Sequence, residues 1–301
     1  MKEIVVISGK GGTGKTSITA SFSALAAEDL VAADCDVDAA DMHLLLKPDL
    51  AKEEDFYSGE TAVIDPAACV ACGRCYEVCR FNAVRAAGMV FAVDPLSCEG
   101  CGYCARVCPT EAITNVPEKA GVWYSSRTRL GFTMIHAKLG IGSENSGKLV
   151  AHVKKQAKAA ALAQEKRYVL VDGSPGIGCP VVSSLSGADY VVLVTEPTVF
   201  GLHDLKRVYE LVRKFKIPAG CVINKADINA AMTGMIRAFL EAERIDLLAE
   251  LPYDENVTKA MVAGLTIVEY DTGMLKEKLH GAWDKVRGRV DTMNHTKEHT
   301  V

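Results

Sequence analysis

Short runs of apolar, mostly β-branched residues recur along the chain without alternating with polar residues. A strand that is covered on both faces has this pattern, because neither of its two rows of side chains meets water. Each run is therefore predicted to be a buried strand. The predicted strands are Ile4–Ser8, Leu30–Ala33, Tyr168–Asp172, Tyr190–Thr195 and Gly220–Asn224.

Longer stretches with helical periodicity separate these runs. We predict helices over Thr16–Ala27, Gly147–Glu165, Leu202–Lys214, Ala230–Glu243 and Glu255–Ala263. Alternating strands and helices indicate an α/β fold, a mostly parallel sheet with helices on both faces. The second of these helices carries Lys154, Lys155 and Lys158 among alanines, and we expect a solvated face there, with docking of an acidic partner as the alternative.

Two later segments have weaker patterns. Gly121–Leu139 alternates enough to form two strands that are joined at Leu130-Gly131. The apolar residues of Leu275–Val290 lie near one helical stripe. We expect this stripe to pack on the parent domain, and the alternative is an amphipathic helix on a membrane surface.

The alternation stops between about Thr61 and Pro117, in a short segment that is rich in cysteine. Within it, DPAACVACGRCYEVCRFNAV resembles DPLSCEGCGYCARVCPTEAI, which follows 29 residues later. A duplication this close predicts two structurally equivalent halves. We therefore predict a small domain at residues 61–117, inserted into a larger domain that is formed by residues 1–60 and 118–301.

Composition narrows the class of protein further. The 301 residues are 49% hydrophobic, and a formal net charge of −4 gives no general reason to bind nucleic acid or an acidic membrane. The chain begins as a strand rather than a signal peptide, and no apolar run approaches the ~20 residues that span a bilayer. Eleven cysteines, mostly clustered, favour metal ligation in a reducing cytoplasm over secreted disulfides. We expect a cytoplasmic protein with no nucleic-acid partner and no stable membrane anchor.

The sequence GKGGTGKT matches the phosphate-binding loop (P-loop) G-x-x-x-x-G-K-[ST] between a predicted strand and a predicted helix. Its glycines let backbone N–H groups cradle phosphate oxygens, and the helix directs its positive end at the same anion. Lys15 would reach the terminal phosphates, and the Thr16 hydroxyl would bind Mg²⁺. The alternative is a plain glycine turn. The predicted nucleotide-binding residues are Gly9, Lys10, Gly11, Gly12, Thr13, Gly14, Lys15, Thr16 and Ser17.

Aspartates follow two of the predicted strands. Asp172 ends one strand, a suitable position from which to hold Mg²⁺ through water. Asp36 and Asp38 follow another strand, and we assign Asp36 to the Mg²⁺ site and Asp38 to orienting the attacking water. Helix capping or solvated loop charge is the alternative for these aspartates.

With its second lysine, Lys10, the loop resembles the deviant Walker A loop of the MinD/ParA/Mrp family of P-loop ATPases. DCDVDAAD and DGSPGIGCPV also resemble the two switches of that family, and the likeness covers most of the chain outside the insert. The resemblance implies a nucleotide-bridged dimer, either a homodimer or a dimer with a related ATPase. In it, Lys10 would reach the nucleotide of the partner and stabilise charge on the transferred phosphoryl group. The alternative is that Lys10 only adds charge to its own loop.

The same resemblance implies where the base binds. The segments INKAD and LPYDENVTKA are similar to those that contact and enclose adenine in the family. Asn224 to Asp227 also spell N-K-x-D, by which GTPases read guanine, but we favour ATP, with Mg²⁺. The implied base-site residues are Asn224, Lys225, Pro252, Tyr253 and Asp254.

Eight cysteines form two runs with the spacing C-x₂-C-x₂-C-x₃-C, which is typical of bacterial two-cluster ferredoxins. In that arrangement the fourth cysteine of each run belongs to the other cluster. Zinc and disulfides are the alternatives, but zinc ribbons use pairs of C-x₂-C rather than triple runs. Arg80 follows Cys79 where Pro109 follows Cys108, which makes the two sites inequivalent. We expect one 4Fe–4S cluster on Cys69, Cys72, Cys75 and Cys108, and another on Cys98, Cys101, Cys104 and Cys79.

Three cysteines lie outside the runs. We expect Cys35 and Cys221 to be buried packing residues. Cys179 lies in the second switch, the region where the nitrogenase iron protein of this family holds a cluster shared between subunits. A shared cluster is therefore the alternative reading of Cys179.

Together these features predict an ATPase that couples nucleotide state to electron transfer or to metal-cluster handling, with a redox or metal-cofactor protein as its partner. The physical basis is that phosphate-sensing switches reorganise when the γ-phosphate is lost. One alternative is an iron–sulfur carrier or scaffold whose ATPase only gates partner docking. A spatial organiser that binds membrane or DNA is the third reading, and the acidic charge balance argues against it.

Overall fold

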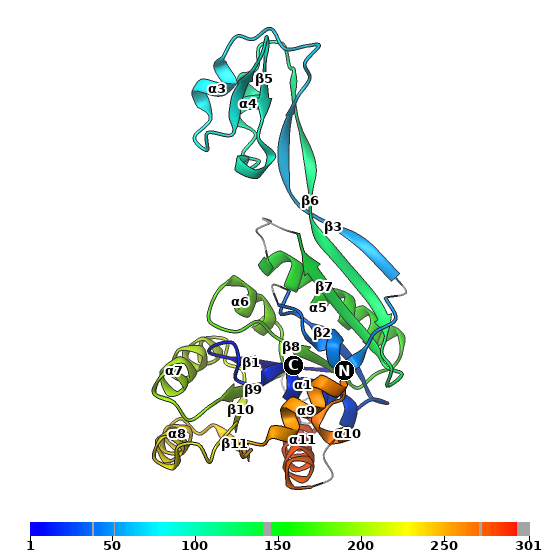
Figure 1. The fold of residues 1–301 in the computed structure, drawn as a ribbon, viewed down its shortest axis with the longest axis vertical. Helices are drawn as coiled ribbons and strands as arrows, with labels where there is room; N and C mark the ends of the chain where they lie inside the picture. The colour runs from blue at the N-terminus through cyan, green and yellow to red at the C-terminus, as the bar shows by residue number, and fades with distance from the viewer. Residues whose placement is uncertain (38, 51, 141–145, 271–272, 294–301) are drawn as a thin grey trace, which may run out of the picture. The chain divides into compact units, whose positions relative to one another are not determined.

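The computed structural model of the chain describes residues 1–37, 39–50, 52–140, 146–270 and 273–293. These residues have the predicted α/β fold, with helices on both faces of a mostly parallel sheet (Figure 1). The strands of this sheet are β1 (Lys2–Ser8), β2 (Leu30–Asp34), β3 (Lys52–Ile64), β6 (Ile113–Arg127), β7 (Thr133–Leu139), β8 (Tyr168–Asp172), β9 (Tyr190–Thr195), β10 (Ala219–Ile223) and β11 (Asp246–Glu250). The accompanying helices are α1 (Lys15–Leu25), α2 (Met42–Leu46), α5 (Ser146–Ala163), α6 (Cys179–Leu185), α7 (Val199–Lys214), α8 (Ala230–Ala242), α9 (Glu255–Ala263), α10 (Ile267–Tyr270) and α11 (Met274–Thr292).

The strands are ordered β11-β10-β9-β1-β8-β2-β7-β6-β3 across the sheet. β1 pairs in parallel with both β8 and β9, and β2 pairs in parallel with β8 and β7. β1, β2, β8 and β9 are buried along their whole length, which is why their sequences show no polar alternation. Because these strands are parallel, the loops that follow them all lie at the carboxyl ends of the strands, on one side of the sheet.

Most elements predicted for the larger domain are confirmed to within a few residues. β8, β9 and α9 have the predicted bounds, and β6 and β7 are joined near Leu130-Gly131 as expected. β11 is not predicted by the pattern. It is one of the two edge strands of the sheet, is mostly half-buried and has an acidic residue at each end, so it lacks a continuous apolar run.

The chain folds as two compact units. Unit 1 consists of Met1–Glu54, Trp123–Lys138 and Ser146–Val301, and unit 2 of Asp55–Val122 and Leu139–Asn145. β3 and β6 each contribute residues to both units. The predicted insert at residues 61–117 lies inside unit 2.

Unit 2 is built from the duplicated motif. α3 (Arg74–Val78) and α4 (Tyr103–Val107) occupy equivalent places in the two repeats, and β4 (Val84–Ala87) pairs antiparallel with β5 (Val90–Val93). The backbone has positive φ at three pairs of equivalent positions, which confirms two structurally equivalent halves. These pairs are Ala71 and Gly100, Gly73 and Gly102, and Asn82 and Glu111.

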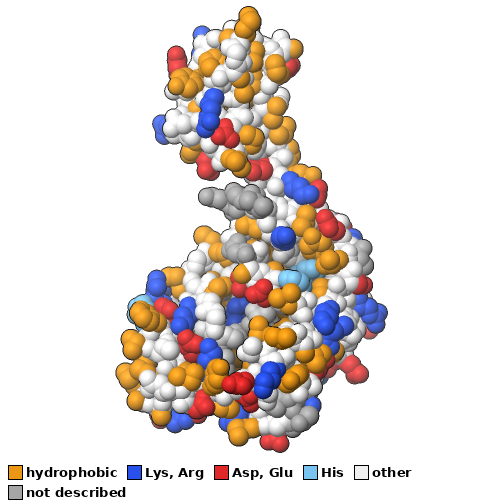
Figure 2. Space-filling model, in the orientation of Figure 1, with side chains coloured by type: hydrophobic (Ala, Val, Ile, Leu, Met, Phe, Trp, Pro, Cys, Tyr) orange, Lys and Arg blue, Asp and Glu red, His pale blue; other side chains and the backbone are white. Residues whose placement is uncertain are grey.

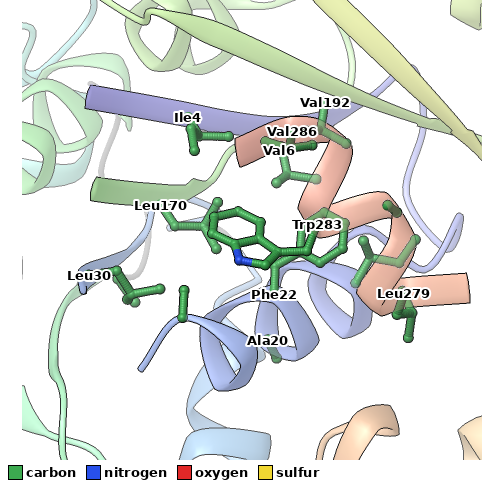
Figure 3. Close-up of a cluster of buried hydrophobic side chains, with 14 of the residues drawn as sticks. Ile4, Val6, Ala20, Phe22, Leu30, Leu170, Val192, Leu279, Trp283 and Val286 are labelled. Atoms are coloured by element: carbon green, nitrogen blue, oxygen red, sulfur yellow. The ribbon is translucent and has the colours of Figure 1, made fainter. Parts of the chain in front are cut away.

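α11 covers the core of unit 1 with the predicted apolar stripe. The Trp283 ring lies beside the Phe22 ring of α1 (Figure 3), at 5.5 Å between centroids. Its centroid is 5.8 Å from that of the Tyr168 ring of β8. Packing on the parent domain is therefore confirmed. Among the described residues, no helix has the length and apolar character needed to cross a bilayer. The buried side chains of the stripe are Leu275, Leu279, Ala282, Trp283, Val286 and Val290.

The prediction of a solvated lysine face on α5 is wrong for Lys154. This residue is only 3% exposed, and its Nζ lies 2.8 Å from Glu3 Oε1. The same Nζ donates to the backbone carbonyls of Ser183 and Ser186, at 3.1 and 2.7 Å, where α6 ends. Burial lowers the pKa of Lys154, although Glu3 acts in the opposite direction. The helical pattern could not show this, because the carboxylate partner comes from the first strand.

Replacing Trp283 with Ala should lower the free energy of unfolding by about 3–5 kcal/mol, because it removes a large buried side chain and leaves a cavity. Met274→Ala in the same helix is the control, since Met274 is 61% exposed, and it should cost only about 0.5 kcal/mol. Chemical denaturation measures both values. Equal losses would show that α11 does not depend on the Trp283 contacts.

Candidate functional site

The phosphate-binding loop lies at the carboxyl end of β1 and runs directly into α1. β1 has β8 on one side and β9 on the other, so the loop opens where the strand order changes direction. Gly12 and Gly14 have φ values of 78° and 89°, which glycine adopts without a steric penalty. The free N–H groups and the positive dipole end of α1 therefore adjoin a loop whose backbone can approach an anion closely.

Lys15 is buried among carboxylates from two neighbouring strands. Its Nζ lies 2.9 Å from Asp172 Oδ1 and 3.4 Å from Asp36 Oδ2. Burial alone would lower the pKa of Lys15, but Asp172 and Asp36 outweigh it, and the pKa is raised. Lys15 is thus held in its charged form at the start of α1, as binding to phosphate requires.

Asp172 is the centre of the polar network beside this lysine. Its side chain is fully buried, and its two oxygens accept hydrogen bonds from Thr16 Oγ1 at 2.7 Å and Thr19 Oγ1 at 2.8 Å. In the part of the chain that the structure describes, no three His, Cys, Asp or Glu side chains surround one metal-ion position. Mg²⁺ does not need such a group, because it usually keeps several waters and takes one or two protein oxygens. The structure brings Thr16, Asp36 and Asp172 together, and their Mg²⁺ role stays a prediction.

Asp34 belongs to this site although the motif analysis did not single it out. It is fully buried at the end of β2, and its carboxylate accepts hydrogen bonds from Asp36 N at 3.1 Å and Met42 N at 3.3 Å. Burial and the nearby charge of Asp172 raise the pKa of Asp34 well above its usual range. Asp34 therefore anchors both ends of the first switch. Asp38, the predicted water-orienting residue, falls between these anchors but lies outside the described residues.

Lys10 is paired within its own chain. Its Nζ lies 2.6 Å from Glu196 Oε1, and the other oxygen of Glu196 lies 3.0 Å from Lys225 Nζ. Partial burial raises the pKa of Glu196, but the hydrogen bonds from Lys10 and Lys225 more than offset it, so the pKa is lowered. Glu196 follows β9 and was not predicted as a site residue. Any action of Lys10 on a second subunit would require it to leave this carboxylate.

The segments expected to hold the base adjoin the loop and one another. Asn224 Nδ2 donates to the carbonyl oxygen of Thr13 at 2.8 Å, which links the INKAD segment to the phosphate-binding loop. Tyr253 N donates to Asp227 Oδ1 at 2.7 Å, so the loop Pro252–Asp254 meets the end of that segment. The Asp254 side chain caps the N-terminus of α9, which gives it a structural role as well.

Unit 2 contains two cavities, each lined by four cysteines, three from one run and one from the other. Cys69, Cys72, Cys75 and Cys108 line the first, which we name the Cys69 cavity. Cys98, Cys101, Cys104 and Cys79 line the second, the Cys98 cavity. These are the two sets that the ferredoxin spacing predicts, and cluster ligation by them stays a prediction.

The fourth cysteine of each run lies among backbone donors. Ala83 N donates to Cys79 Sγ at 3.3 Å. Partial burial raises the pKa of Cys79 and of Cys108, but backbone N–H groups outweigh it and lower both values. Burial raises the pKa of Cys75 and Cys104. Metals bind the thiolate, so the N–H groups around Cys79 and Cys108 favour the form that can act as a ligand.

The remaining cysteines differ in exposure. Cys35 and Cys221 are fully buried, as predicted for packing residues. Cys179 is exposed and is the first residue of α6, within the predicted second switch.

Fold and site together define a P-loop nucleotide-binding protein. Residues 4–267 match the model of the CobQ/CobB/MinD/ParA nucleotide-binding domain. The chain belongs to this family of nucleotide-binding domains.

Known proteins share the sequence or the fold over most of the chain. The uncharacterized protein MJ0578 of Methanocaldococcus jannaschii is 34% identical over 230 residues, which are 75% of this chain and 79% of that protein. The cell division ATPase MinD of Pyrococcus furiosus has a similar fold, with a TM-score of 0.56, 18% identity and coverage of 95% of this chain and 98% of that one. The septum site-determining protein MinD of Pyrococcus horikoshii, complexed with Mg-ADP, gives a TM-score of 0.56, 17% identity and 95% coverage of each chain.

Gly9 and Gly11 form a matched pair for testing the loop geometry. A Cβ on Gly9 would lie 2.5 Å from Asp204 Cβ and 2.6 Å from Asp204 backbone atoms, whereas one on Gly11 would meet nothing within 4 Å. Gly9→Ala should therefore lower the free energy of unfolding by about 1–3 kcal/mol through overpacking. Gly11→Ala should change it by only about 0.5 kcal/mol. Denaturation without nucleotide measures both, and equal stabilities would contradict the close contact of the loop with α7.

Proposed function

We propose that this protein binds and hydrolyses Mg-ATP as a nucleotide-bridged dimer and couples nucleotide state to electron transfer or metal-cluster handling through two 4Fe–4S clusters. One observation carries the proposal: eight cysteines sort into two cavities, and each cavity takes three from one run and one from the other. This arrangement occurs in a chain whose other unit carries a phosphate-binding loop.

The nucleotide half of the proposal rests on the charges around the loop. Lys15 and the start of α1 would bind the terminal phosphates, and Thr16 with Asp36 and Asp172 would hold Mg²⁺ directly or through water. Asp38 would orient the attacking water. The similar MinD of Pyrococcus horikoshii, solved with Mg-ADP, supports this choice of ligand.

The cysteine sets fit a cubane cluster better than a single metal ion. Each iron of a 4Fe–4S cluster takes one cysteine, so the cluster needs four thiolates around a shared space rather than three donors at one point. The described residues offer no three-donor site for a single ion, but they line two cavities with four cysteines each. When bound, such clusters supply one-electron transfer. We therefore propose residues 61–117 as a ferredoxin-like domain that works in the cytoplasm, where thiols stay reduced.

The proposed partners are proteins rather than nucleic acids. The dimer would form with a second copy or with a related ATPase, and electrons or clusters would pass to a redox or metal-cofactor protein. On the face of unit 1 drawn in Figure 2, basic and acidic side chains are interspersed, which is not the pattern of a nucleic-acid-binding surface.

Anaerobically purified protein should contain about eight iron and eight sulfide per chain. Pairs of cysteine substitutions test which cysteines of the two runs bind each proposed cluster. Cys79→Ala with Cys101→Ala removes two ligands of one proposed cluster and should leave about four iron. Cys79→Ala with Cys72→Ala lies within one run but damages both proposed clusters, so iron should fall towards zero.

The exposed Cys179, outside both runs, is the control, and Cys179→Ala should keep the full iron content. Stoichiometric zinc in place of iron would contradict the cluster assignment. If the Cys79 and Cys72 pair retained four iron and the Cys79 and Cys101 pair lost all, each cluster would belong to a single run. Reversible reduction of the loaded clusters would favour electron transfer over a permanent scaffold.

Lys10→Ala should leave nucleotide binding by a single subunit nearly intact while lowering hydrolysis by about 10³–10⁵-fold, the effect of a cation supplied across an interface in other nucleotide hydrolases. Lys15→Ala should abolish binding in its own site. Mixed together, the two variants should recover activity, because one site of each heterodimer then has both lysines. Hydrolysis assays with light scattering, which checks that heterodimers form, measure this. Heterodimers without activity would show that Lys10 acts only in its own loop.

A further inference from the structure

The two cysteine cavities differ at positions that the internal repeat makes equivalent. Two residues after the fourth cysteine of a run, the Cys69 cavity is lined by Thr110 and the Cys98 cavity by Phe81. One residue after the first cysteine, the Cys69 cavity is lined by Val70 and the Cys98 cavity by Glu99. The matching backbone conformations of the two halves mean that these are differences of side chain on one shared framework.

Thr110 offers a hydrogen-bond donor to one cluster ligand. Its Oγ1 lies 3.7 Å from Cys108 Sγ and 2.9 Å from the carbonyl oxygen of Ala68, to which it donates. A coordinated Cys108 is a thiolate without a proton, so Thr110 must be the donor in the sulfur contact. The Ala68 carbonyl competes for the same proton, but hydrogen bonds to a charged acceptor are roughly twice as strong as neutral ones. The ring of Phe81 can make no such bond to Cys79.

Glu99 acts on the other cavity through its charge. Apart from the cysteines, it is the one side chain among the described residues lining either cavity that carries a charge at neutral pH. Reduction of a cluster adds a negative charge, so a neighbouring carboxylate opposes it and a hydrogen bond to a ligand sulfur favours it. Glu99 is exposed, and dissolved salt therefore screens part of its effect.

We propose that the two clusters have different reduction potentials, that the cluster of the Cys69 cavity has the higher one, and that Thr110 and Glu99 set the difference. This inference rests on the proposed function, because it requires both clusters. A chain that holds one electron, received from a low-potential one-electron carrier, keeps it in the Cys69 cavity. The transfer within the chain oxidises the cluster of the Cys98 cavity and reduces that of the Cys69 cavity by one electron, and no bond or proton is exchanged. The cluster of the Cys98 cavity is therefore the stronger electron donor of the two.

A redox titration of the anaerobically purified full chain, followed by electron paramagnetic resonance, tests this inference. Iron and sulfide are measured first, and two reduction waves are expected. Thr110→Val keeps the shape of the side chain but removes its hydroxyl, and it should lower the upper wave alone. Glu99→Gln removes only the charge, and it should raise the lower wave alone, less so at high salt. We expect each to change the equilibrium constant for reduction severalfold, and a tenfold change corresponds to 59 mV for one electron.

Glu77→Gln is the matched control, because Glu77 is an exposed carboxylate on α3 that lines neither cavity. It should leave both waves in place. If Thr110→Val loads less iron, Thr110→Ser, which keeps the hydroxyl, should restore both iron and potential, and Glu99→Gln still decides the assignment of the lower wave. Two loaded clusters with one shared potential, or Glu99→Gln shifting the upper wave, would overturn this inference alone. A preparation without clusters would overturn the proposed function together with it.

Discussion

The contact between Lys15 and Asp172 is the interaction on which the nucleotide site of unit 1 depends. Both side chains are almost completely buried, and removing the Lys15 charge would leave the Asp172 carboxylate without its cation, which in comparable sites costs about 3–5 kcal/mol. The pair joins the first residue of α1 to the last residue of β8. Thr16 donates to one oxygen of Asp172 and Thr19 to the other, so the carboxylate is held in one orientation. This arrangement requires parallel strands, because only then do β1 and β8 end at the same edge.

The same site holds more negative than positive charge. Asp34, Asp36 and Asp172 lie around one buried ammonium, and burial together with the nearby charge of Asp172 raises the pKa of Asp34. A divalent cation that arrives with a nucleotide would balance this excess, as bound cations do in other phosphate sites. The hydrogen bonds of Asp34 connect this charged site to the first switch, because they hold the backbone at Asp36 and at Met42.

Unit 2 has a different source of stability. Its apolar core is small, and its cysteines pack against the few aliphatic residues that form it. A core of this size rarely supports a folded domain alone, and small domains often depend on metal bonds instead. Thiolate–metal bonds that exist only in the folded form contribute directly to folding free energy. If unit 2 binds the proposed clusters, their loss should loosen it, while unit 1 keeps its own large core. That core surrounds Trp283 and is formed by residues of α1, α11 and the buried strands.

The sequence by itself determined the features that depend on local patterns. Buried parallel strands need unbroken apolar runs, the phosphate loop needs its glycines and lysine in fixed order, and the two cysteine repeats need matching spacing. Periodicity therefore predicted β1, β8, β9 and α9, and the repeat predicted the two equivalent halves of unit 2.

Only the tertiary structure decided which side chains from distant segments meet. Lys154 looked like a surface lysine because Glu3, its partner, belongs to the first strand. Glu196 had no visible role until β9 placed it beside Lys10, and Asp34 was not singled out until the fold placed its buried carboxylate near Asp172. A buried charge is stable only beside a partner of opposite charge. A local sequence pattern cannot show that partner when it comes from a distant part of the chain.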